Sequence, residues 1–175
     1  DGLIRSFTGY LTQVGACLTL EKTPSVRFGF IHGMWALDNS RVQSGRRMWC
    51  GVNRELDLLL SHGCYADYTF PCAGSMSPRF MPSKIFFSRD SDLPKSYDYV
   101  TGIKEASVGR SPAADELTLF QGPIISTNID ATHPPTYSDM TQWVGCRVRV
   151  TGRDEWVFVK VYTHSAQDLD NPVGR

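Results

Sequence analysis

The sequence of 175 residues has no excess of charge, because eighteen Lys and Arg residues balance eighteen Asp and Glu residues. A general nucleic-acid binder normally carries a basic excess or a basic stripe, so nucleic acid is not the expected partner. No apolar run approaches the ~20 residues that a membrane-spanning helix needs, and we expect no membrane span. The first residues also lack the basic and apolar regions of a signal peptide, so the expected location is cytoplasmic.

Paired cysteines and the common catalytic motifs are also missing. The five cysteines include no Cys-x-x-Cys pair, which argues against a disulfide framework and a zinc knuckle and favours reduced thiols. The sequence contains no Gly-x-Gly-x-x-Gly, no Gly-Lys-Ser/Thr loop, no His-Glu-x-x-His and no Gly-x-Ser-x-Gly. Nucleotide-driven and serine-hydrolase chemistry therefore have no support in the sequence.

What is present is an ordinary globular composition, with 41% hydrophobic and 21% charged residues. This length supports one domain with a hydrophobic core, so we expect residues 1–175 to form a single α/β domain. Apolar residues at helical spacing predict an amphipathic helix from about residue 2 to Cys17. A buried strand is expected over 26–31, a helix over about 52–62 with Gly63 as its capping glycine, and a strand over 64–70.

The second half of the chain alternates irregular and regular segments. Residues 72–115 are rich in Ser, Pro and charge and predict a long irregular loop region, interrupted by a strand at 84–87. A strand at 116–120, a helix at 135–144 and a strand at 156–162 follow. This order predicts a mainly parallel sheet with crossover helices, in which ligands bind beyond the carboxyl ends of the strands.

Polar side chains occur at these predicted strand ends. His32 and His164 each follow an apolar strand, where an imidazole could act as acid, base or metal ligand. A hydrogen-bonded structural histidine is the other interpretation. Asp67 lies inside a strand, so its carboxylate must be paired, hydrogen-bonded or facing a cavity. Gln121 ends a further strand and joins this group as a candidate substrate-binding residue.

Two neighbouring features could bind a polar ligand. Asp38 and Asn39 follow His32 in a loop, where they could bind substrate or orient the histidine, or form an ordinary Asx turn. Trp35 and Tyr68 lie close to the same segments. Aromatic side chains beside carboxylates and amides suit the stacking of sugar rings, but they are also typical of a core.

Three segments together resemble the polysaccharide-deacetylase (NodB-homology) superfamily, in particular a bacterial branch associated with exopolysaccharide genes. They are residues 28–40 (FGFIHGMWALDNS), residues 50–71 with CGVNREL and GCYADYTFP, and residues 156–165 (WVFVKVYTHS). The resemblance implies a distorted (β/α) barrel of which this chain is the later part. It also implies a hydrolase acting on C–N bonds other than peptide bonds, which removes N-acetyl groups from a polysaccharide or oligosaccharide.

The resemblance further implies a divalent metal, with zinc as the candidate, and a late histidine that protonates the leaving amine; His164 matches that histidine. His32, Asp67 and His164 are therefore the expected catalytic residues. The sequence departs from the family in lacking Asp-Asp-Gly and His-x-x-x-His, so the metal ligands are unknown. A non-catalytic carbohydrate-binding or scaffold protein on the same fold is the alternative function.

Overall fold

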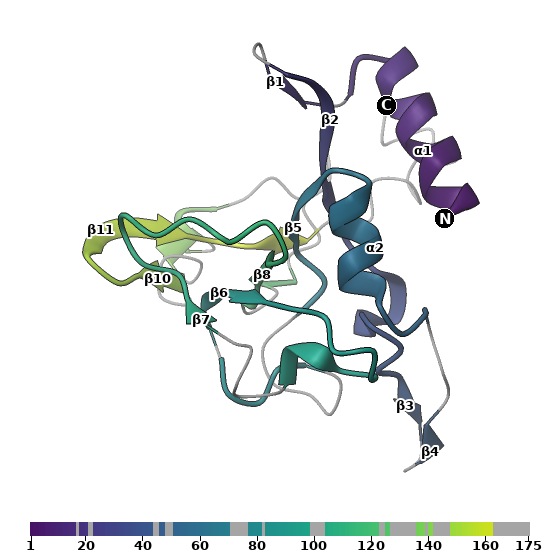
Figure 1. Cartoon of the computed structure of the whole chain (residues 1–175). Coiled ribbons are helices and arrows are strands. Elements are labelled where there is room, and N and C mark those ends of the chain that lie inside the picture. The colour runs from purple at the N-terminus through teal and green to yellow at the C-terminus, as the bar shows by residue number, and fades with distance from the viewer. Residues whose placement is uncertain are drawn as a thin grey trace, which may run out of the picture.

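The computed structural model describes most of the chain in an arrangement dominated by one sheet (Figure 1). The residues that it describes are 1–16, 18–20, 23–43, 46–47, 51–70, 77–81, 83–98, 104–122, 125–126, 136–138, 140–141 and 148–162. Most of the expected helix at 135–144 falls outside these ranges, and His164 falls outside them entirely. The expected strand at 84–87 is confirmed as β6 (Ile85–Ser88).

The main sheet is six-stranded and mixed, with the order β1-β2-β5-β8-β6-β7. Its other strands are β1 (Leu18–Leu20), β2 (Thr23–Phe30), β5 (Cys64–Asp67), β7 (Lys104–Glu105) and β8 (Leu117–Phe120). Strands β2, β5 and β8 are parallel, with Phe30 opposite Asp67 and Asp67 opposite Leu119. The carboxyl ends of these three strands therefore lie at one edge of the sheet.

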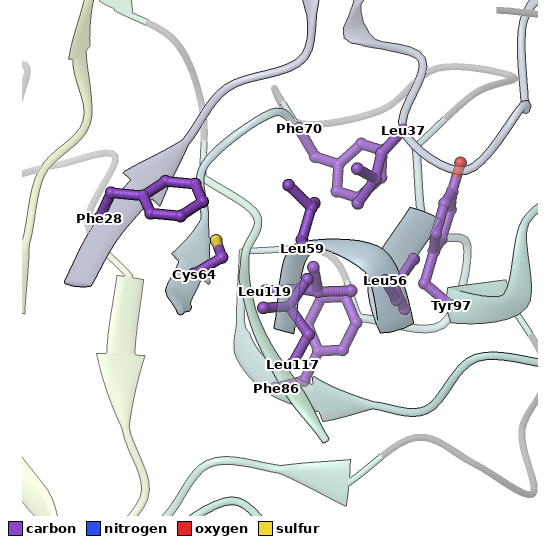
Figure 2. Packing of buried hydrophobic residues seen from close by; sticks show 10 residues of the cluster. All are labelled: Phe28, Leu37, Leu56, Leu59, Cys64, Phe70, Phe86, Tyr97, Leu117 and Leu119. Carbon is purple, nitrogen blue, oxygen red and sulfur yellow. The ribbon is translucent and has the colours of Figure 1, made fainter. Parts of the chain in front are cut away.

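The helix α2 (Glu55–Ser61) packs its apolar side against β5 and β8. Leu56 and Leu59 are three residues apart, so they share one helix face, and both are fully buried. Figure 2 shows them among side chains from the sheet, from the loops that carry Leu37 and Phe70, and from the segment Ser96–Asp98. The remaining members of this core are Phe28, Leu37, Cys64, Phe70, Phe86, Tyr97, Leu117 and Leu119.

The capping glycine expected after this helix is confirmed. Gly63 has a φ of +92°, and a β-carbon there would lie 2.2 Å from the carbonyl oxygen of Val26. Only glycine allows this left-handed turn so close to β2. The turn directs the chain from α2 straight into β5.

The helix α1 (Gly2–Gln13) is shorter than expected and contributes no buried residue. It lies beside β2 (Figure 1), and its exposed apolar side chains include Leu3 and Tyr10. Among the described residues, helices fall short of the length and apolar character that crossing a membrane requires.

The expected barrel is wrong. The described strands of the main sheet form an open sheet with β1 and β7 at its edges, accompanied by the helices α1 and α2. The strand β6, expected within the irregular segment, pairs antiparallel with both β8 and β7. An antiparallel neighbour needs no crossover helix, so this part of the chain extends the sheet without the βαβ repeat that closes a barrel.

The strand expected over 156–162 is present as two shorter strands, but its expected place in the main parallel sheet is wrong. Residues Arg153–Phe158 form β11, which is exposed along its length and pairs antiparallel with β10 (Val148–Val150) in a separate sheet. The apolar side chains Trp156 and Phe158 stack edge to face instead of entering the main core. The short strand β12 (Val161–Tyr162) pairs in parallel with β9 (Ile125–Ser126).

The remaining described elements are two 3-10 turns and a two-stranded ribbon. The 3-10 turns are η1 (Gly33–Trp35) and η2 (Ser96–Asp98), and the two-stranded ribbon consists of β3 (Val42–Gln43) and β4 (Arg46–Arg47). η1 starts directly after His32, so it shapes the loop that carries several of the candidate residues.

Candidate functional site

The carboxyl edge of the parallel strands brings three of the candidate residues to neighbouring strand ends. His32 follows β2, Asp67 is the last residue of β5, and Gln121 follows β8. Because β2, β5 and β8 are adjacent, these residues lie along one edge of the sheet. The parallel pairing that the sequence pattern indicates for these strands produces this arrangement.

The imidazole of His32 is held in one orientation. Its Nδ1 lies 2.7 Å from the carbonyl oxygen of Gly33, and since a carbonyl only accepts, Nδ1 carries the hydrogen. Its Nε2 lies 3.4 Å from Oε1 of Glu55. Nε2 is therefore the basic nitrogen of the neutral ring, and it faces a carboxyl group with which it can share a proton.

Glu55 is the first residue of α2 and is buried beside His32. Its Oε2 accepts the backbone N–H of Asp38 at 2.6 Å, which fixes the carboxyl group at its second oxygen. Burial raises the pKa of Glu55 to about 7, and the neighbouring carboxyl group of Asp38 acts in the same direction. Both protonation states of Glu55 are therefore populated near neutral pH.

Asp38 is a second buried acid in this site. Its Oδ2 accepts the backbone N–H of Ser96 at 2.7 Å, whereas its buried Oδ1 has no hydrogen-bond partner among the residues described. Burial raises the pKa of Asp38 to about 6. The group thus keeps one oxygen that can accept a hydrogen bond or, when protonated, donate one.

Asp67 acts on His32 through Thr69. Its two oxygens accept the backbone N–H of Thr69 at 2.9 Å and the Thr69 hydroxyl at 2.8 Å. The same hydroxyl accepts the backbone N–H of His32 at 2.7 Å. Asp67 itself is 0% exposed, and burial raises its pKa to about 7. It therefore positions the strand end that carries His32 and does not face solvent.

Lys160 follows β11 and joins the second sheet to this edge. Its Nζ donates to the carbonyl oxygens of Tyr68 and Phe70, the latter at 3.2 Å, and its charge interacts with the carboxyl group of Asp67. Burial lowers the pKa of Lys160 to about 8. The backbone around Thr69 is thus held from both sides.

The loop after His32 has an unusual backbone. Trp35, Asp38 and Asn39 all have positive φ, at 56°, 56° and 51°. Non-glycine residues in this conformation are uncommon, and such strain clusters at functional sites. The indole of Trp35 is 52% exposed, so it presents an aromatic surface next to the histidine.

The other candidate residues have structural partners. The Asn39 side-chain amide donates to Oδ1 of Asn53 at 3.1 Å, and the ring of Tyr68 packs against Phe120 with centroids 5.8 Å apart. Gln121 is 1% exposed, and its amide nitrogen, oriented by its surroundings, donates to the carbonyl oxygens of Met81 and Pro78. Of the predicted residues, His32 and Asp38 therefore contact Glu55.

The described residues do not provide a zinc-binding donor set. They contain no group of three or more His, Cys, Asp or Glu side chains arranged to hold a metal ion. Asp67 is enclosed, and both its oxygens are bonded to Thr69. Nδ1 of His32 is bonded to Gly33. We therefore derive no catalytic step through a metal.

Sequence reasoning missed Glu55, Thr69 and Lys160. In the sequence, Glu55 is an acidic residue in the first turn of a predicted helix. Acids are common there because they interact favourably with the helix dipole. Its burial depends on the loop that folds over it. Only the structure shows that Gly51, with a φ of +88°, packs against this group: a β-carbon there would lie 2.5 Å from Oε2 of Glu55.

Comparison of the chain with protein-family models, with curated proteins and with solved structures finds no match.

Proposed function

We propose that this chain acts on acetylated carbohydrate and that His32 and Glu55 form an acid–base pair for the hydrolysis of N-acetyl groups. The observation that carries the proposal is the 3.4 Å separation between Nε2 of His32 and Oε1 of Glu55 at the carboxyl edge of the parallel strands. The histidine faces a carboxyl group that burial keeps near half-protonation at neutral pH. The exposed indole of Trp35 offers a surface on which a sugar ring can stack.

The pair can carry one proton through the reaction. A water molecule adds its oxygen to the acetyl carbonyl carbon while the neutral imidazole of His32 accepts its proton, and the Glu55 carboxylate stabilises the resulting imidazolium. The same proton then passes to the amide nitrogen as the C–N bond breaks. The products are acetate and the free amine of the sugar.

Acetate release from N-acetylglucosamine oligomers by the purified chain tests this proposal. We expect release by the wild type and its loss in His32→Asn and Glu55→Gln. His62→Asn is the matched control, because His62 is bonded to Asp1 and lies outside this site. Release that persists in both site variants contradicts the assignment of the acid–base pair.

The second candidate function is carbohydrate binding without hydrolysis. The enclosure of Asp67, whose two oxygens are bonded to Thr69, favours it, because this carboxylate is not available to a substrate. Glycan binding by the wild type without any acetate release, lost in Trp35→Ala but kept in Glu55→Gln, supports this alternative.

A further inference from the structure

A second concave site lies at the opposite end of the parallel strands from His32. It is a cavity of about 650 Å³ around the start of β5 and the segment that precedes β8. Its lining includes Arg27, Leu60, Cys64, Tyr65, the 112–114 segment and Glu116. Ligand-binding pockets commonly have volumes of about 300–1,000 Å³, so this cavity is large enough for a small organic molecule.

Most of the wall is apolar. Leu60 comes from the end of α2, Cys64 and Tyr65 from the start of β5, and a proline and two alanines from 112–114. Burying an apolar body against these side chains stabilises binding without any polar partner. The lining therefore favours a ligand with a hydrocarbon or aromatic portion.

The two charged side chains of the lining differ in their partners. Oε2 of Glu116 accepts the backbone N–H of Ala113 at 2.9 Å, and its Oε1 lies 2.9 Å from Nζ of Lys104 and 3.7 Å from Nη2 of Arg89. These partners lower the pKa of Glu116 and neutralise its charge locally. The charge of Glu116 is thus paired with two basic side chains of the protein.

Arg27, in contrast, has no carboxylate partner among the described residues. It lies on β2, is half-buried as a residue and lines the cavity. A guanidinium group binds carboxylates through two parallel hydrogen bonds, and such charge-assisted pairs are strong in partly buried sites. The cavity therefore combines an apolar wall with one uncompensated positive charge.

We propose that this cavity binds a small organic carboxylate with an apolar body, and that Arg27 pairs with the carboxylate. The site is separate from the His32–Glu55 pair, because the two lie at opposite ends of the same parallel strands. The proposal does not depend on the hydrolytic function.

Calorimetric titration of the whole chain with octanoate tests the proposal, with 1-octanol as the uncharged analogue. We expect octanoate to bind the wild type at least about tenfold more tightly than 1-octanol, and Arg27→Gln to remove that preference, because a charge-assisted hydrogen bond is lost. Arg153→Gln is the matched control: Arg153 is a surface arginine of β11, outside the cavity lining, and should leave binding unchanged.

A second variant keeps the test independent of any effect on folding. Ala114→Trp narrows the cavity while Arg27 stays in place, and it should weaken octanoate and 1-octanol alike by about tenfold. Circular dichroism confirms that each variant is folded. Equal affinity for octanoate and 1-octanol in the wild type, or unchanged octanoate binding in Arg27→Gln, overturns the proposal.

Discussion

Thr69 satisfies both carboxylate oxygens of Asp67, one through its backbone N–H at 2.9 Å and one through its hydroxyl at 2.8 Å. The hydroxyl oxygen also accepts the backbone N–H of His32 at 2.7 Å. One side chain therefore connects the ends of β2 and β5 and offsets the cost of burying an acid. This relationship leads to the first of four predictions.

Replacing Thr69 by valine should destabilise the protein by about 1–3 kcal/mol, because it leaves a buried carboxyl oxygen and a buried N–H without their partner. Urea unfolding measures the change. Thr118→Val on β8 is the matched control, and we expect it to change the free energy of unfolding by less than about 0.5 kcal/mol. Equal effects of the two substitutions would show that the Thr69 hydroxyl stabilises the folded protein no more than the Thr118 hydroxyl does.

Replacing Gly51 by alanine should displace the carboxyl group of Glu55. The new β-carbon would lie 2.5 Å from Oε2 of Glu55, which is itself bonded to the N–H of Asp38. Gly109→Ala is the control, because Gly109 also has positive φ (+80°) but no atom within 4 Å of the new β-carbon. We expect about 1 kcal/mol of strain in the control and about 1 kcal/mol more in Gly51→Ala, measured by urea unfolding.

Replacing Asp90 by alanine should weaken the start of α2. Arg54, the residue before the helix, makes no capping hydrogen bond with its side chain, whereas Oδ2 of Asp90 accepts the N–H groups of Leu56 at 3.1 Å and Asp57 at 3.3 Å. Loss of such a cap costs about 0.5–2 kcal/mol.

The control for this variant is Asp92→Ala. Asp92 makes an exposed ion pair with Arg54 at 2.9 Å, and exposed pairs contribute less than about 1 kcal/mol. Thermal unfolding of the two variants should show the larger loss for Asp90→Ala. The reverse order would mean that the cap does not stabilise the helix.

Stability should fall as the pH rises from about 4.5 to 7. Burial raises the folded-state pKa of Asp38 to about 6 and those of Glu55 and Asp67 to about 7, so the folded protein holds protons that the unfolded chain has released. Their stabilising contribution is complete below the unfolded pKa and is lost as the pH passes the folded pKa. Each group contributes a slope of up to about 1.4 kcal/mol per pH unit.

Urea unfolding at pH 5 and pH 7.5 measures this loss. Glu55→Gln removes one of the titrating groups and should reduce the difference between the two pH values, whereas Glu155→Gln on the exposed strand β11 should not. The acids whose pKa is lowered change the free energy of unfolding only below about pH 4.5, and Lys160 changes it only above about pH 8. Their titration therefore does not contribute between pH 5 and pH 7.5. Stability that rises from pH 5 to pH 7.5 would contradict the prediction.

The local pattern of apolar and polar residues predicts most of the elements of the main sheet but not how they are arranged. The strands over 26–31, 64–70, 84–87 and 116–120 and the helix over 52–62 correspond to β2, β5, β6, β8 and α2. The apolar run at 156–162 was misjudged, because a run of apolar residues indicates a strand without indicating what covers it. In the structure the part of this run up to Phe158 lies on the exposed strand β11.

In the candidate site, too, some residues could be predicted from the sequence and others could not. His32 and Asp67 could be predicted because polar residues that interrupt or end apolar strands stand out in a sequence. Glu55 could not, because a glutamate in the first turn of a helix is ordinary until a loop with Asp38 closes over it.

The sequence by itself determined where strands and α2 form, the turn at Gly63 and the polar residues at the strand ends, since these depend on side chains close together along the chain. Only the tertiary structure decided that the sheet stays open, that Asp67 is enclosed by Thr69, and that Glu55 faces His32. These features depend on pairing and burial between distant segments, which change the protonation and accessibility of a side chain without changing its local pattern.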